Sequence, residues 1–297
     1  MSFKTIPVYA RFQWLNNPIV INTLELFLKP NTRGRKGYDK VWMFRLLIYK
    51  QLMGCSYRDL ESVSANLGKK INYSTFIKFK KRLKDKFWFK NIFEILSQGI
   101  AVILPSITAL IDSTFVETYS GYDEKGSEYF DYKEKNGFKL HQMIDWKTRL
   151  PILQFATPGA RSDIRWGANL IRAAPEYWNI KELAADKAYD GANFVKDIAI
   201  KFPGIKIAIP MRRHKKNDSW FNVFMKGWER TKSKKIYKKR SEIERHFSRK
   251  KGVFNLGEER TRGLQNFEAN AYLVSIAQIL EWSTKPEIWI ALFTKLL

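Results

Sequence analysis

The sequence contains 297 residues, of which 45% are hydrophobic and 15% aromatic, and this composition excludes a disordered chain and allows a core of normal size. Its single cysteine, Cys55, excludes an internal disulfide framework. We find no secretory signal and no apolar run of bilayer length, so we expect a cytoplasmic, nucleoid-associated protein that no membrane anchors. The 53 Lys and Arg residues exceed the 29 Asp and Glu residues by 24, which predicts a polyanionic partner.

The positive charge is divided into two blocks. Residues 1–111 hold 19 basic and 6 acidic side chains, and residues 207–262 hold 18 basic and 6 acidic ones. Residues 112–206, which lie between them, hold 14 side chains of each sign. A basic surface that is only solvated would not need this division. The distribution therefore favours nucleic-acid binding by two basic segments that bracket a neutral segment containing carboxylates.

The first 100 residues are predicted to form a small all-α domain, and residues 101–297 a second domain. Apolar residues suggest a helix over Pro18–Leu28, and a flexible arm follows at residues 31–37. A second helix is predicted over Val41–Met53, where apolar residues recur at helical spacing.

Two local signals mark where these helices end and begin. Gly54 can end the second helix. The run from Ser56 to Asp59 matches a capping box, in which the serine and the acid bond the exposed amides of a helix start.

A third helix is predicted to begin at Ser74, and it mixes basic with aromatic side chains. Its basic residues are Lys78, Lys80, Lys81, Arg82 and Lys84. Short helices joined by tight turns resemble a helix-turn-helix module, so we expect Lys78, Lys81 and Arg82 to contact DNA. A helical packing or dimerisation domain is the alternative.

From residue 107 the apolar pattern changes to that of strands alternating with helices, which predicts an α/β sheet. The predicted strands are Ile107–Ile111, Phe138–Trp146, Leu150–Thr157, Ile180–Ala185 and Ile205–Ile209. The predicted helices are Arg165–Ala174, Ala192–Lys201, Tyr237–Lys251 and Leu264–Trp282. The segment 211–230 is polar and shows no clear period.

Two aspartates follow buried strands. Asp112 comes directly after Ile107–Ile111, and Asp186 comes directly after Ile180–Ala185. Because the ends of adjacent strands share a crevice in an open α/β sheet, these carboxylates can converge. Each aspartate alone is more often a turn former or a helix cap than a metal ligand.

The basic helix near the C-terminus carries a third acid. Tyr237, Arg240, Glu244 and Lys251 fall within a stripe about 60° wide when residues turn by about 100° each. Glu242 points to another side of the same helix. A charged, solvated helix face is the alternative to a functional one.

Three carboxylates among cations suit phosphodiester chemistry. Oxygen ligands favour Mg²⁺ or Mn²⁺ over zinc, and His141, His214 and His246 show none of the paired spacings of a zinc site. Two such ions would activate an attacking oxygen and stabilise a leaving oxygen. Arg240 and Lys251 could then hold phosphates.

These residues resemble the insertion-sequence transposases of the DDE type, which have an RNase H-like catalytic core. Tyr237, Arg240, Glu244 and Lys251 match the Y-R-E-K signature of that family without a gap. The motif around Asp186 resembles the family's second-aspartate motif, except that Ala188 stands where a glycine is common.

The resemblance implies a mixed sheet flanked by helices, preceded by a small all-α domain. It implies that Asp112, Asp186 and Glu244 are the catalytic metal ligands for two Mg²⁺ or Mn²⁺ ions, and that Tyr237, Arg240 and Lys251 contact DNA. The implied reaction is cleavage at the ends of an insertion sequence, followed by joining of the freed 3′ hydroxyl to target DNA.

The implied partner is double-stranded DNA, as terminal inverted repeats and as target, with a homodimer on the DNA. Only 57 residues separate Asp186 from Glu244, so any insertion before the glutamate is small. Stacking of Trp220 or Trp228 on a flipped base is therefore less favoured than plain packing. A transposase-derived DNA-binding protein that does not cut, and another RNase H-like nuclease, are the alternative functions.

Overall fold

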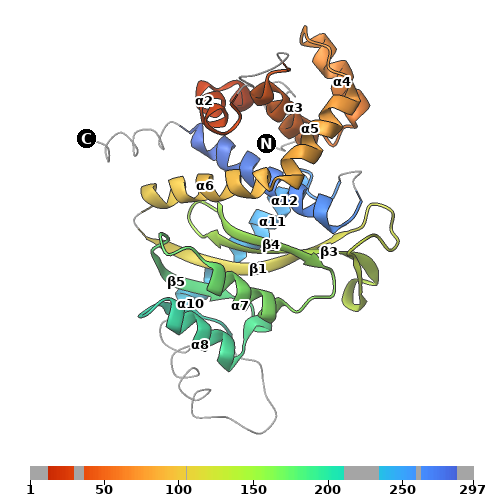
Figure 1. Ribbon diagram of the computed structural model, residues 1–297. Helices are drawn as coiled ribbons and strands as arrows, with labels where there is room; N and C mark the ends of the chain where they lie inside the picture. Colours follow the sequence, from red (N-terminus) through yellow and green to blue (C-terminus); the bar gives the residue numbers. More distant parts are fainter. Residues whose placement is uncertain (1–12, 30–36, 105, 211–233, 259–261, 286–297) are drawn as a thin grey trace, which may run out of the picture.

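This computed structural model describes residues 13–29, 37–104, 106–210, 234–258 and 262–285 (Figure 1). Nearly all of the predicted arm at residues 31–37, and the segment 211–230 with Trp220 and Trp228, lie outside the described residues. Among the described residues, no helix combines the length and the apolar character that a membrane crossing requires.

The N-terminal part is helical, as the sequence predicts. Its elements are η2 (Gln13–Asn16), α2 (Pro18–Phe27), α3 (Lys40–Met53), α4 (Tyr57–Asn66), α5 (Tyr73–Asp85) and α6 (Trp88–Ile103). Gly54 ends α3 in the left-handed conformation, and Ser56 and Asp59 form both bonds of the capping box at the start of α4. Helix α5 begins one residue earlier than predicted, because Asn72 accepts the amide of Ser74 and acts as its cap.

The second part contains a six-stranded mixed sheet. Its strands are β1 (Ile107–Glu117), β2 (Glu128–Phe130), β3 (Lys135–Asp145), β4 (Pro151–Pro158), β5 (Ile180–Ala185) and β6 (Lys206–Ala208). The order of the strands is β2-β3-β1-β5-β6. Strands β2 and β4 both pair with the edge of β3 that faces away from β1, β2 with its first residues and β4 with the residues that follow. Strands β1, β3 and β4 are antiparallel, whereas β5 and β6 continue the sheet in parallel from β1. This is the RNase H-like arrangement that the sequence predicts.

The helices of this part lie around the sheet. They are η3 (Asp131–Lys133), α7 (Asp163–Ala173), η4 (Lys187–Tyr189), α8 (Ala192–Lys201), α10 (Lys234–Lys238), α11 (Ser241–Gly252) and α12 (Leu264–Ser283). Alternate residues of the central strands point to opposite faces. Leu110 and Ala184 pack against Ile243 of α11, while Ile111 belongs to the larger core that includes α7 and α8.

Strand β1 is longer than predicted, and Asp112 lies inside it. The parallel pairing with β5 stops at Ile111 and Ala185, but the antiparallel pairing with β3 continues to Glu117 and Gly137. Beyond Ile111, β1 is therefore paired with β3 but no longer with β5. The prediction that β1 ends at Asp112 was wrong, although Asp112 does lie where the parallel part of the sheet ends.

The single helix predicted over Tyr237–Lys251 is divided. Helix α10 ends at Lys238, and the amides of Lys239 and Arg240 bond carbonyls three residues back, as in a tighter 3₁₀ turn, before α11 begins. A period of 3.6 residues in the sequence does not distinguish these two turn types. Tyr237 and Arg240 still lie together, with the guanidinium carbon 5.7 Å from the ring centre.

Helix α12 joins the two parts of the chain. Figure 1 shows α6 and α12 running between the N-terminal helices and the sheet. Nearly every residue of α12 from Phe267 to Leu280 is buried, on all sides of the helix. One hydrophobic cluster extends from Leu15 to Trp282 and includes both parts. The division into domains at residue 100 stays a prediction.

Candidate active site

The pairing of β1 with β5 places Asp112 next to Asp186. The register pairs Ile111 with Ala185, and each aspartate is the following residue. Parallel strands present their carboxyl ends at one edge of the sheet. The two aspartates, 74 positions apart in the sequence, therefore lie on neighbouring strands at the same edge.

The Asp112 carboxylate is only about a fifth exposed, at 21%. Burial raises its pKa to about 7. The amide of Ser113, which donates to Oδ1 at 2.8 Å, and the nearby Arg240 lower the pKa, while the charges of Asp186 and Asp163 raise it further. Asp112 is thus a buried carboxylate whose charge Arg240 and the Ser113 amide only partly offset.

Asp186 occupies the turn that follows β5. Its side chain accepts the amide of Lys187 and caps the short helix η4. This is the ordinary role of an aspartate at such a position. Its charge also acts on both Asp112 and Arg240, so Asp186 belongs to the same electrostatic cluster.

Glu244 lies in the first turn of α11 and connects to the aspartates through Arg240. Arg240 Nη2 donates to Glu244 Oε1 at 2.6 Å, and Arg240 Nη1 lies 3.6 Å from Asp112 Oδ2. Although burial lowers the pKa of Arg240, Tyr237 and the acids Glu244, Asp186 and Asp112 raise it above the ordinary value. The structure therefore brings all three predicted acids around one guanidinium group.

Buried polar side chains fix α11 to its neighbours. His246 Nε2 lies 2.8 Å from Gln142 Oε1, and Lys250 Nζ donates to Ser275 Oγ of α12 at 2.6 Å. Burial lowers the pKa of His246 and of Lys250 well below the ordinary values. Gln142 of β3 is the register partner of Asp112. This network therefore connects α11, which carries Glu244, to the strand that pairs with Asp112.

The donor set fits a divalent cation once Arg240 has moved. Among the described residues, no three His, Cys, Asp or Glu side chains lie close enough to hold a metal ion. The three acids offer carboxylate oxygens, which Mg²⁺ and Mn²⁺ prefer. Arg240 occupies the position next to Asp112 and Glu244 from which a cation would neutralise them. The Glu244 side chain is 59% exposed, and it forms an ion pair with Arg240.

Tyr237 and Lys251 contact different elements near this cluster. Tyr237 is partly buried against the apolar residues between α10, α11 and the sheet. Lys251 Nζ donates to the carbonyl oxygen of Phe115 in β1 at 2.7 Å, and burial and the charge of Lys133 lower its pKa. In this structure Lys251 therefore contacts the strand of Asp112, three residues beyond the acid.

The basic residues of α5 divide into two groups. Lys78, Lys81 and Arg82 are exposed. Lys80 and Lys84 instead turn toward α12, where they donate to Asn270 and Asn266 respectively. The sequence places all five on one basic helix, but the structure leaves three of them available to a partner.

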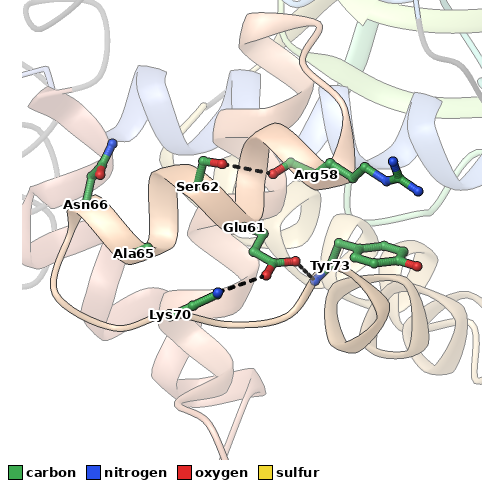
Figure 2. A pocket seen from close by; sticks show the side chains of 7 residues that line it. All are labelled: Arg58, Glu61, Ser62, Ala65, Asn66, Lys70 and Tyr73. Carbon is green, nitrogen blue, oxygen red and sulfur yellow. Dashed lines mark hydrogen bonds and ion pairs between the residues drawn. The ribbon is translucent and has the colours of Figure 1, made fainter.

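A pocket that the sequence did not predict lies between α4 and α5, away from the acids (Figure 2). Its volume is about 510 Å³. The guanidinium carbon of Arg58 lies 5.6 Å from the ring centre of Tyr73, and Lys70 forms an ion pair with Glu61 at 3.7 Å. Glu61 also accepts the amide of Tyr73 at 2.9 Å, which fixes the start of α5. The pocket adds Arg58 and Lys70 to the cations of this helical pair.

A fourth carboxylate, Asp163, lies beside the acids; the sequence places it in a loop-to-helix region that could border the site, without including it among the catalytic residues. It lies in the first turn of α7, and its charge acts on Asp112. Two ionisable residues at alternating positions of a buried strand, Lys139 and His141, were the signal that could have indicated a polar cluster.

Comparison with known proteins identifies the family. The family model described as "Transposase DDE domain" matches residues 104–280, which is more than half of the chain. The chain therefore belongs to the family of transposases with a DDE domain. No curated protein matches the sequence.

The fold also resembles a solved structure. A chain of the cryo-EM structure of the piggyBac transposase synaptic complex with hairpin DNA superposes with a TM-score of 0.42 at 14% identity. The match covers 71% of this chain and 52% of that chain, so this protein spans about half the length of that transposase.

Proposed function

We propose that this transposase cleaves DNA at the ends of an insertion sequence and joins the freed 3′ hydroxyl to target DNA. The observation that carries the proposal is the gathering of Asp112, Asp186 and Glu244 around Arg240, from two neighbouring strands and a helix. Acids that a fold gathers in this way, from distant parts of the sequence, are typical of a catalytic site.

The three acids would hold divalent cations, and Mg²⁺ or Mn²⁺ fits their oxygen donors. Two such ions, when bound, activate an attacking oxygen and stabilise a leaving oxygen. A cation held by these acids would take the place of Arg240 beside Asp112 and Glu244, and the Arg240 guanidinium would then be able to bind a DNA phosphate. Lys251 and Tyr237 lie near the site and contact the same DNA strand.

The chemistry requires no covalent bond to the protein. In cleavage, a water oxygen attacks the phosphorus at the end of the element, and the 3′ oxygen leaves as a hydroxyl. In strand transfer, that 3′ hydroxyl loses its proton and attacks a phosphorus of the target, and the target's own 3′ oxygen leaves. One phosphodiester bond is broken for each one formed in the second step.

The experiment uses purified full-length protein, linear DNA with the gene's flanking repeats, and Mn²⁺. We expect nicks at the repeat boundary and joined products on a sequencing gel. Nicks without joined products would favour another RNase H-like nuclease. Binding without nicks would favour a transposase-derived protein that does not cut.

Two parts of the proposal concern DNA binding. Residues 1–100 would form a DNA-binding domain that uses Lys78, Lys81 and Arg82 of α5, together with Arg58 of α4, which lies on Tyr73 at the start of α5. The protein would act as a homodimer on DNA, because two ends of an element must be held together. Light scattering with and without DNA that carries the repeats measures this change in mass.

A further inference from the structure

The Asp163 carboxylate is the centre of a polar cluster behind Asp112. Ser113 Oγ donates to Asp163 Oδ1 at 2.6 Å, and Lys139 Nζ lies 3.1 Å from the same oxygen. His141 Nδ1 lies 3.7 Å from it. Lys139 is 5% exposed and His141 is fully buried, while the Asp163 side chain is 30% exposed, so buried cationic groups hold a carboxylate that solvent still reaches.

Asp163 does not act as a cap of its own helix. A carboxylate in the first turn of a helix commonly bonds the amides there. Among the described residues, however, the hydrogen-bonding partner of Asp163 is a side chain of β1, and the charged ones belong to β3. The helix start therefore does not explain this aspartate.

Ser113 connects Asp163 to Asp112. The amide of Ser113 donates to Asp112 Oδ1 at 2.8 Å, while its hydroxyl donates to Asp163. One residue thus holds a carboxylate on each side of β1. A change at Asp163 alters the partner of the Ser113 side chain and, through the same residue, the amide that orients Asp112.

Gly167 allows η4 to approach this cluster. A Cβ atom at Gly167 would lie 2.6 Å from the ring of Tyr189, so a larger residue would push η4 away from α7. The Tyr189 ring is buried against this glycine, and its hydroxyl feels the charges of Asp112, Asp163 and Asp186. The close packing keeps the first turn of α7 beside the turn that contains Asp186.

Two buried polar atoms in this cluster lack a hydrogen bond. Within the described residues, Tyr189 Oη and His141 Nδ1 have no hydrogen bond of good geometry. Ser113, which Tyr189 approaches, gives its own hydroxyl hydrogen to Asp163. Buried polar groups usually have a hydrogen-bond partner, so the fold tolerates two unmade hydrogen bonds in the cluster around Asp163.

We propose that Asp163 is a positioning residue of the active site, which fixes the Asp112 carboxylate through Ser113 for a divalent cation. The inference rests on the proposed function, because it takes Asp112 as a ligand of that cation. Partners that orient a metal ligand from behind commonly control metal affinity almost as strongly as the ligand does.

The test is Mn²⁺ binding to the full-length protein by titration calorimetry. Asp163→Asn should weaken Mn²⁺ binding about 10-fold, the size of effect that such supporting residues have. Ser113→Ala removes the connection and keeps the charge of Asp163, so it should weaken binding in the same direction. If Asp163→Asn does not fold, Ser113→Ala decides the question.

Glu182→Gln is the matched control. Glu182 accepts the hydroxyl of Thr108, another residue of β1, at 2.8 Å and the ammonium of Lys239 at 2.6 Å. Like Asp163, it therefore contacts a hydroxyl group of β1 and a lysine. Its hydroxyl partner, Thr108, lies five residues before Ser113 along the strand. Its removal should leave Mn²⁺ affinity unchanged, and an equal loss in this variant would overturn the inference.

Asp112→Asn separates the two proposals. If Asp112→Asn loses Mn²⁺ binding while Asp163→Asn and Ser113→Ala both bind Mn²⁺ as tightly as the native protein, the positioning role is wrong and the proposed function stands. If Asp112→Asn itself binds Mn²⁺ normally, the proposed function fails. Weakened binding in all three variants supports both.

Discussion

The two ends of the parallel part of β1 carry opposite charge arrangements. Near its start, Glu182 of β5 meets Thr108 and Lys239, and although burial opposes it, these partners hold the pKa of Glu182 below its ordinary value. Near its end, Asp112 lies among other acids, and burial raises its pKa to about 7. The paired carboxylate stabilises the fold, whereas the surplus of carboxylates at the other end is what a functional site requires.

The basic helix α5 shows the same division. Lys80 and Lys84 bond asparagines of α12, whereas Lys78 and Lys81 are exposed. Helix α5 thus carries two kinds of lysine. Some bond side chains within the protein, and others remain exposed to a partner. The following predictions test this distinction at both places.

The largest effect is expected from Asp112→Asn, compared with Glu182→Gln. Removal of the Asp112 charge should lower the rate of DNA cleavage by at least about 10³-fold, the upper end for one electrostatic group in a transition state. DNA binding should remain, because the shape is unchanged. Glu182→Gln should cleave at nearly the native rate and lose about 1 kcal/mol of stability. Equal cleavage by both variants would remove the distinction between the two ends.

Metal ions that bind at the Asp112 end of the parallel part of β1 should increase the stability of the folded protein. At a concentration 100 times its dissociation constant, a ligand that binds only the folded state adds about 2.7 kcal/mol. We therefore expect Mn²⁺ to raise Tm by several degrees, EDTA to reverse the shift, and Asp112→Asn to abolish it, as measured by differential scanning fluorimetry. A shift of the same size in Asp112→Asn would mean that the ion binds elsewhere.

The exposed cations of α5 should contribute to DNA affinity, and the internal ones to stability. Replacement of Lys78, Lys81 and Arg82 by alanine should weaken DNA binding about 10-fold and reduce the slope of log affinity against log salt by up to about 3. Lys80→Ala should instead lower Tm and leave the salt slope unchanged. Fluorescence anisotropy across a salt series separates the two results, and an unchanged slope in the triple variant would exclude this face.

The last prediction concerns stability against pH without metal. The folded pKa of Asp112 is about 7, and its ordinary value is 3.8. Between these values the folded state holds a proton that the unfolded state releases, so stability is lost as the pH rises through this window. In EDTA, the native protein should therefore lose stability from pH 5 to pH 8 relative to Asp112→Asn. Urea unfolding of both proteins measures the difference, and parallel pH profiles would contradict it.

Much of this arrangement follows from local patterns in the sequence. The apolar runs before Asp112 and Asp186 predict two buried strands, and their equal relation to the aspartates predicts a shared edge. The helical spacing of Tyr237, Arg240 and Glu244 predicts one face, which the structure keeps. These features depend on residues close together in the chain.

The features that were missed depend on distant partners. Strand β1 continues past Asp112 because β3 pairs with it as far as Gly137, and the polar residues after Asp112 give no sign of this. Lys80 turns inward because α12 offers Asn270, 190 positions away. The contacts of Asp163 could not be predicted for the same reason, since its partners lie on β1 and β3.

Helix α12 has a mechanical consequence. It bonds α5 through Asn266 and α11 through Ser275 and Glu281. Fifteen residues of helix, a stiff rod about 22 Å long, separate the first of these contacts from the last. A displacement of α5 would therefore reach α11 through this one helix, without passing through the sheet.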